Sequence, residues 1–151
     1  MQQALTKDVN KCPRESETKM NQLSYGVLKK LKNTSFQEAK SKVKTALKSE
    51  GFGVLTEIDV KEIMKKKLNL DFRNYVILGA CNPSLAHKAL QADSHLGLLL
   101  PCNVVVQETT NGAVEVSFAD PKAMFTLVEA PEATPVAQEA EQRLRHAFSV
   151  I

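Results

Sequence analysis

Apolar and polar positions alternate in several short segments of the chain, and such alternation is typical of half-buried strands. The segments are residues 23–27, 53–58, 73–81, 101–108 and 113–118. The last two flank the pair Asn111-Gly112, which is typical of a tight hairpin turn. We therefore expect these two strands to be antiparallel neighbours.

Between the strands, apolar residues recur at helical spacing behind residues that cap helices. Ser35 and Glu38 form a capping box, and Gly51 stands where the glycine after a helix belongs. Asp59 begins a second helix, which ends near Leu68. Three further helices are predicted where a capping residue is followed directly by proline, a residue common in the first turn of a helix. These pairs are Asn82-Pro83, Asp120-Pro121 and Thr134-Pro135. The resulting order is β-α-β-α-β-α-β-β-α-α, a pattern that is also compatible with a parallel α/β sheet, although the final hairpin requires at least one antiparallel pair.

Composition and length place this domain at residues 21–151. Residues 1–20 are polar and lack periodicity, so we expect a disordered leader, with Met20 at the start of the compact unit. No apolar run approaches the roughly 18 residues of a membrane helix. Because three cysteines are too few to staple a secreted fold, we expect reduced thiols and a cytoplasmic protein.

The net charge of +3 conceals an asymmetry between the two halves of the chain. Residues 1–75 carry sixteen Lys and Arg against nine Asp and Glu, whereas residues 76–151 carry four against eight. A basic half can attract nucleic acid. No aromatic residues interleave with the lysines to stack bases, however, so we interpret the lysines as solvated helix faces and do not expect nucleic-acid binding.

Several separated blocks resemble one known family. They are residues 51–59, 71–73, 78–83, 86–87 and 99–104, and they occur in the family's order. They are similar to the signature blocks of the domain-of-unknown-function family 302 of bacteria and archaea. The resemblance covers the chain from about residue 22 to its end.

The resemblance implies a two-layer α+β fold of the TATA-binding-protein-like kind, in which helices cover one face of a curved, largely antiparallel sheet. It also implies a homodimer. It implies no activity, catalytic residue or cofactor, because none is established for the family. The leader is the one part that the family core does not require.

The candidate chemistry lies at Cys81, His87 and Cys102. Cys81 directly precedes the helix that begins at Asn82-Pro83, and a helix N-terminus lowers the pKa of a thiol. If the strands of Cys81 and Cys102 are antiparallel neighbours, the two thiols lie close together, with His87 one turn into the helix. This set predicts a metal ion site, a redox pair or a nucleophile with its base. Unpaired cysteines are also common core residues, so both thiols could be buried and inert.

Other polar residues carry weaker predictions. We expect Arg73 and Asp71 to pair or cap locally, and Arg73 is also a candidate contact for an anionic ligand. Glu57 and Asp59 invite an acid–base interpretation, but Asp59 already caps a helix, and both lie away from Cys81. The apolar segment 96–100 predicts a surface for self-association.

Three functions remain open from the sequence. The favoured one is a homodimeric domain that binds a small ligand or a metal ion. The alternatives are a thiol-dependent enzyme or redox protein that uses Cys81, and a structural or regulatory module that binds a partner.

Overall fold

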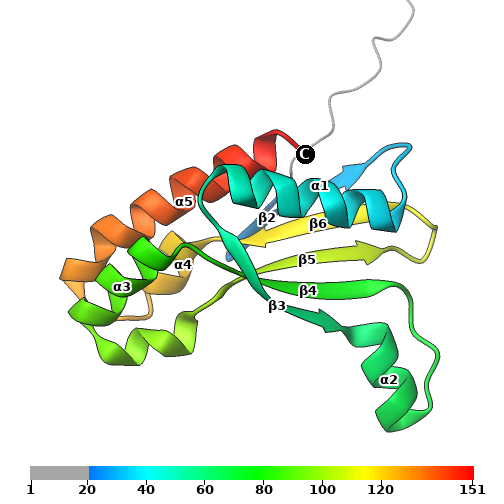
Figure 1. Cartoon of the computed structure of the whole chain (residues 1–151), viewed down its shortest axis with the longest axis horizontal. Helices are drawn as coiled ribbons and strands as arrows, with labels where there is room; N and C mark the ends of the chain where they lie inside the picture. Colours follow the sequence, from blue (N-terminus) through cyan, green and yellow to red (C-terminus); the bar gives the residue numbers. More distant parts are fainter. Residues whose placement is uncertain (1–20) are drawn as a thin grey trace, which may run out of the picture.

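Six strands form one sheet across residues 21–151, the part of the chain that the computed structural model describes (Figure 1). In spatial order they are β1 (Asn21–Leu23), β2 (Gly26–Leu31), β6 (Val114–Ala119), β5 (Cys102–Glu108), β4 (Tyr75–Cys81) and β3 (Gly53–Asp59). Every neighbouring pair is antiparallel, and β5 and β6 form the predicted hairpin. The predicted leader, residues 1–20, lies outside the described residues.

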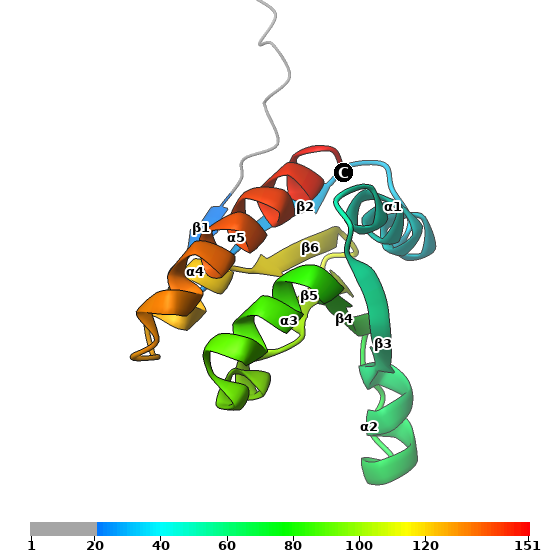
Figure 2. The same ribbon diagram turned by 60° about the vertical axis from the view of Figure 1, so that its left-hand side comes forward.

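The longer helices α1 (Phe36–Ser49), α3 (Pro83–Ala92) and α5 (Thr134–Ser149) lie on one side of this sheet (Figure 2). The short helix α4 (Pro121–Phe125) follows β6 and lies beside α5. Two 3-10 helices, η1 (Ser94–Leu99) and η2 (Pro131–Ala133), complete the connections. This arrangement confirms the predicted fold class, an α+β fold with a largely antiparallel sheet and helices on one face. We call the other side of the sheet the open face.

The helix α2 (Val60–Leu68) is an exception, because it projects from the end of β3 at the edge of the sheet (Figure 1). None of its residues is buried, and Ile63 and Leu68 expose 44% and 60% of their surface. Within the described residues, no helix combines the length and the apolar character needed to cross a membrane.

The predicted caps set the ends of the helices. The hydroxyl of Ser35 accepts a hydrogen bond from the Glu38 amide, and the Glu38 carboxylate accepts one from the Ser35 amide. Gly51 adopts a φ of 79°, a conformation that costs a residue with a Cβ considerably more than glycine. Asp59 and Asn82 accept hydrogen bonds from the first turns of α2 and α3.

The core lies between the sheet and the helices because successive strand residues point to opposite faces. Most even-numbered residues of β4, β5 and β6, such as Leu78, Val104 and Phe118, are buried toward the helices. They pack with apolar residues of α1 and α5. The Phe118 and Phe148 rings meet edge to face, with centroids 5.3 Å apart.

One strand prediction was wrong. The alternating segment 23–27 is not a single strand, because Ser24 and Tyr25 form a tight turn that joins β1 to β2. A Cβ on Gly26 would lie 2.6 Å from the carbonyl oxygen of Phe118, so only glycine lets β2 begin this close to β6.

Candidate functional site

A pocket of about 500 Å³ opens where β5 and β6 part. The two strands pair from Glu108 and Val114 as far as Val104 and Phe118. Beyond this point Ala119 pairs with Gly26 of β2, whereas Cys102 pairs with Ala80 of β4. The strands therefore separate at this end of the sheet, and residues from both of its faces line the pocket.

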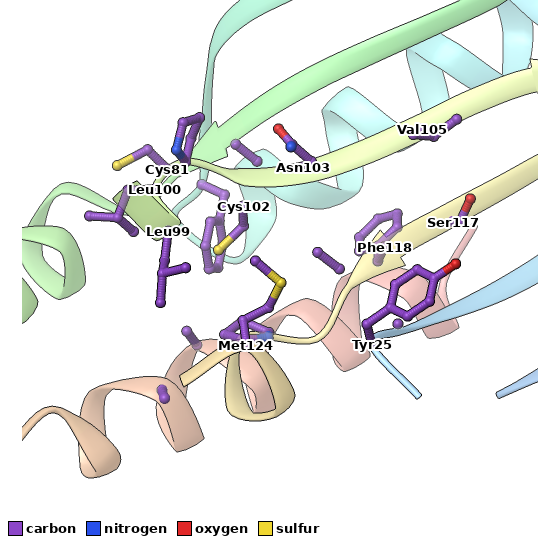
Figure 3. Close-up of a pocket in the computed structure, with 18 of the residues that line it drawn as sticks. Tyr25, Cys81, Leu99, Leu100, Cys102, Asn103, Val105, Ser117, Phe118 and Met124 are labelled. Carbon is purple, nitrogen blue, oxygen red and sulfur yellow. The ribbon is translucent and has the colours of Figure 1, made fainter. Parts of the chain in front are cut away.

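The inner part of the pocket lies on the helix side and is apolar. Its walls include Ala86 of α3, Leu99 of η1, Met124 of α4 and Ala137 of α5. In Figure 3 the side chain of Cys102 points into this space, toward Met124. Apart from the two thiols and the Asn82 cap, small and apolar side chains make this part of the lining.

The outer part of the pocket lies on the open face and is mixed in character. Leu28 and Val105 flank Ser117 on either side in the strand register. Tyr25 and Asn103 add polar groups, and Figure 3 shows Asn103, Val105 and Ser117 on the side of the strands away from Met124. Tyr25 is 64% exposed, so it stands at the mouth of the pocket.

Cys81 and Cys102 both line the pocket, as the predicted strand pairing requires. Cys102 pairs with Ala80, the residue before Cys81, so the end of β4 meets the start of β5. The two cysteines are half-buried and unpaired as thiols. Strand alternation places their side chains on opposite faces, and in Figure 3 the Cys81 sulfur points away from that of Cys102.

The prediction that the helix N-terminus lowers the pKa of Cys81 was wrong. Burial raises the pKa of the Cys81 thiol, because desolvation disfavours the thiolate. Burial, followed by the neighbouring charge of ionised Cys81, raises the pKa of Cys102 to about 11. At neutral pH both thiols are therefore protonated. The nucleophilic form of cysteine is the thiolate, so these two thiols are better suited to line the pocket than to attack a substrate.

His87 does not join the two thiols. It is exposed on α3 and is not among the pocket-lining residues, because Leu85 and Ala89 occupy the buried side of the helix. Across residues 21–151, no three His, Cys, Asp or Glu side chains come close enough to hold a metal ion. The structure therefore gives no support to a metal site formed by Cys81, His87 and Cys102.

Arg73 lies beside the outer pocket but is engaged by other side chains. Its guanidinium donates two hydrogen bonds to Oε1 of Gln107, at 3.1 and 3.0 Å, and stacks on the rings of Phe72 and Tyr75. Nε2 of Gln107 then donates to Oε1 of Glu115 at 3.1 Å. The expected local pair with Asp71 is absent, since Asp71 pairs with Lys65.

The sequence analysis missed Gln107, Glu115 and Ser117. All three are odd-numbered positions of β5 and β6, and their neighbours Val106, Val114, Val116 and Phe118 are buried. The alternation alone could have placed these three polar side chains on one face. It could not have shown that the strands part beside them.

Several of the described basic residues in the first half form ion pairs on the surface. Lys40 and Lys44 of α1 both bind Glu57 of β3, and these contacts lower the pKa of Glu57. Lys66 pairs with Glu62 one turn earlier in α2. Glu57 therefore links α1 to the edge strand β3. The strand register places Cys81 opposite Gly53, four residues before Glu57, which confirms the predicted separation of Glu57 from Cys81.

Comparisons with known proteins agree with this architecture. Residues 27–151 match the family described as Domain of unknown function DUF302. A crystal structure of an uncharacterized conserved DUF302 protein from Bacillus stearothermophilus is similar to this chain, with a TM-score of 0.75 and 30% identity. The similarity covers 83% of this chain and 96% of that one. An uncharacterized protein of Aquifex aeolicus (strain VF5) is 26% identical over 125 residues, 81% of each chain.

The fold thus defines an α+β protein with helices over one face of an antiparallel sheet. The chain belongs to the DUF302 family.

Proposed function

We propose that this domain binds a small, largely apolar molecule in the pocket between β5 and β6. The observation that carries the proposal is the pocket itself, a cavity of about 500 Å³ with a mostly apolar lining and a few polar groups. Small-molecule sites in proteins are concave, mostly apolar and roughly 300–1,000 Å³ in volume. The polar side chains gather on the open-face side, so a ligand would bury its apolar part beneath the helices.

Ligand binding ranks above thiol chemistry for a physical reason. A catalytic thiol needs a depressed pKa and a neighbouring base. Burial raises the pKa of both pocket thiols, and His87 is exposed on the far side of α3 from Leu85 and Ala89. The thiols are better suited to line an apolar cavity. From the low cysteine content of the chain we also propose a cytoplasmic location.

We further propose that the domain is a homodimer. The loop predicted for self-association offers little exposed surface, because Leu96 is buried and Leu99 and Leu100 line the pocket; only Leu98 is exposed, at 87%. Exposed apolar side chains are more numerous along β3, α2 and the segment after it. They are Leu55, Ile58, Ile63, Leu68 and Leu70, each at least 41% exposed. Clustered apolar residues on a surface mark interaction sites, and a second copy would cover this edge.

The experiment for the pocket is a binding assay with Nile red, an uncharged apolar dye that becomes fluorescent in apolar surroundings. Wild-type protein is expected to bind the dye saturably. Ala86→Leu places a larger side chain in the inner pocket and is expected to weaken binding by about tenfold, a cost of roughly 1.4 kcal/mol.

The matched control is Gln91→Leu. It adds a leucine to the same helix at an exposed position that does not line the pocket. Equal loss of binding in both variants, or binding by neither the wild type nor the control, would contradict the pocket as the site. Unfolding curves of both variants establish that each is folded.

A further inference from the structure

We infer that the ligand carries, beside its apolar body, a head group that donates hydrogen bonds and is uncharged or cationic, and that Glu115 receives it. This inference rests on the proposed function, because it describes the chemistry of that same pocket. It excludes carboxylates and phosphates as preferred ligands. Three features of the lining support it.

The first feature is the charge of the lining. Among the described residues that line the pocket, Glu115 is the only one with a charged side chain at neutral pH, and there is no Lys, Arg or His. The two thiols are protonated there, because the pKa of each is raised. The lining therefore offers an anionic ligand a negative charge and no cation of its own; the nearest cation in the strand register, Lys30 of β2, lies opposite Glu115 but does not line the pocket.

The second feature is the unused capacity of Glu115. Its Oε1 accepts a hydrogen bond from Nε2 of Gln107 at 3.1 Å, and residues 21–151 provide no second hydrogen bond to this carboxylate. An ionised carboxylate has about four lone-pair sites for hydrogen bonds. A donating head group on the ligand could occupy those that remain.

The third feature is the arrangement of Arg73, a cation beside the outer pocket. Arg73 is not among the lining residues, and its guanidinium is held by Gln107 and by the rings of Phe72 and Tyr75. The same contacts orient Gln107, because its Oε1 faces Arg73 and its Nε2 faces Glu115. Arg73 thus fixes the position of the glutamine and leaves its own charge outside the pocket.

The strand positions also suit an amphipathic ligand. Glu115 and Ser117 alternate on the open face of β6, about 7 Å apart along the strand. Ser117 lies between Leu28 and Val105, and the apolar inner pocket begins beyond the point where β5 and β6 part. A head group at Glu115 therefore places the apolar body of the ligand over Ser117 and toward the inner pocket.

The test compares three ligands that share one tail: decylamine, decanol and decanoate, each used at neutral pH to displace Nile red. We expect decylamine to displace the dye at a concentration at least about tenfold below that of decanoate, with decanol between them. Glu115→Gln keeps the shape of the side chain and removes its charge. In this variant the advantage of decylamine over decanol is expected to disappear.

Glu108→Gln is the matched control, because Glu108 lies on the neighbouring strand β5 and does not line the pocket. It is expected to keep the wild-type order of the three ligands. Decanoate that binds as tightly as decylamine, or a decylamine preference that survives Glu115→Gln, would overturn this inference and leave the proposed function intact. If none of the three displaces the dye, the proposed function itself fails.

Discussion

The buried ammonium of Lys29 in β2 donates a hydrogen bond to the main-chain carbonyl of Phe148, in the last turn of α5. It also lies 4.7 Å from the centroid of the Phe148 ring. An ammonium group at a helix C-terminus donates a hydrogen bond to a carbonyl that has no partner within the helix, and it is attracted to the negative end of the helix dipole. Lys29 therefore links β2 to the C-terminal end of α5.

Replacement of Lys29 should destabilise the fold in two distinguishable steps. Burial lowers the pKa of Lys29, because desolvation disfavours the ammonium form. This desolvation cost offsets part of the stabilisation from the hydrogen bond, so Lys29→Met should cost only about 1 kcal/mol of unfolding free energy. Lys29→Ala also removes the packed stem and should cost roughly 2–3 kcal/mol. Lys30→Ala, at the exposed neighbouring position, should change stability by less than about 0.5 kcal/mol. Urea unfolding measures all three, and an equal cost at both lysines would contradict the capping role.

Stability should fall at high pH because of Cys102. Its folded-state pKa is about 11, above the ordinary value of 9.0, so the unfolded chain loses this proton first as the pH rises. The contribution is fully present below pH 9.0 and is lost as the pH rises toward 11, by roughly 3 kcal/mol for a shift of this size. Cys102→Val has no thiol to ionise. Urea unfolding between pH 9.0 and about 11 compares the wild type with Cys102→Val. As the pH rises, the wild type should lose unfolding free energy relative to the valine variant. A difference between the two proteins that stays constant across this range would contradict the raised pKa.

The two pocket thiols should also differ in reactivity. Cys102 points into the inner pocket and has a pKa of about 11, so its thiolate is scarce at neutral pH. We expect iodoacetamide to label Cys81 before Cys102 in the native protein, and both slowly. Peptide mass spectrometry after short exposures measures the order, and labelling in urea gives the reference rates. Faster labelling of Cys102 in the native protein would show that the inner pocket is more open, or its thiol more acidic, than this structure indicates.

Self-association should depend on α2 and not on the loop that contains Leu98. The double change Ile63→Glu and Leu68→Glu places two charges on the exposed apolar surface and should convert a dimer into a monomer. Leu98→Glu changes a side chain that is still more exposed and should leave the dimer intact. Sedimentation velocity at micromolar concentration distinguishes these outcomes. A wild-type monomer would contradict the proposed dimer, and dissociation only by Leu98→Glu would move the interface to the loop.

Local sequence signals predicted the helices of this fold well, because capping depends on residues a few positions apart. Ser35 with Glu38, and Asn82 with Pro83, begin helices where the sequence places them. Helical phase could also have placed His87 correctly: it lies two residues from both Leu85 and Ala89, and so faces away from the side they bury.

The pocket could not be predicted in the same way, because it depends on long-range register. Tyr25, Cys102 and Met124 line one pocket only because β6 continues along β2 after it has left β5. No local pattern specifies where two paired strands separate. The pKa of Cys81 was mispredicted for a related reason, since its burial depends on neighbours far away in the chain.

The claim that this pocket binds a small apolar molecule is tested most directly by methyl NMR during a titration with decanol. We predict saturable shifts, with one common dissociation constant, for the methyl groups of Ala86, Leu99 and Met124, which line the inner pocket. Leu55 and Leu127, exposed elsewhere on the surface, should not shift. Shifts that never saturate, or that appear at Leu55 and Leu127 while the three pocket methyl groups stay unchanged, would contradict the account.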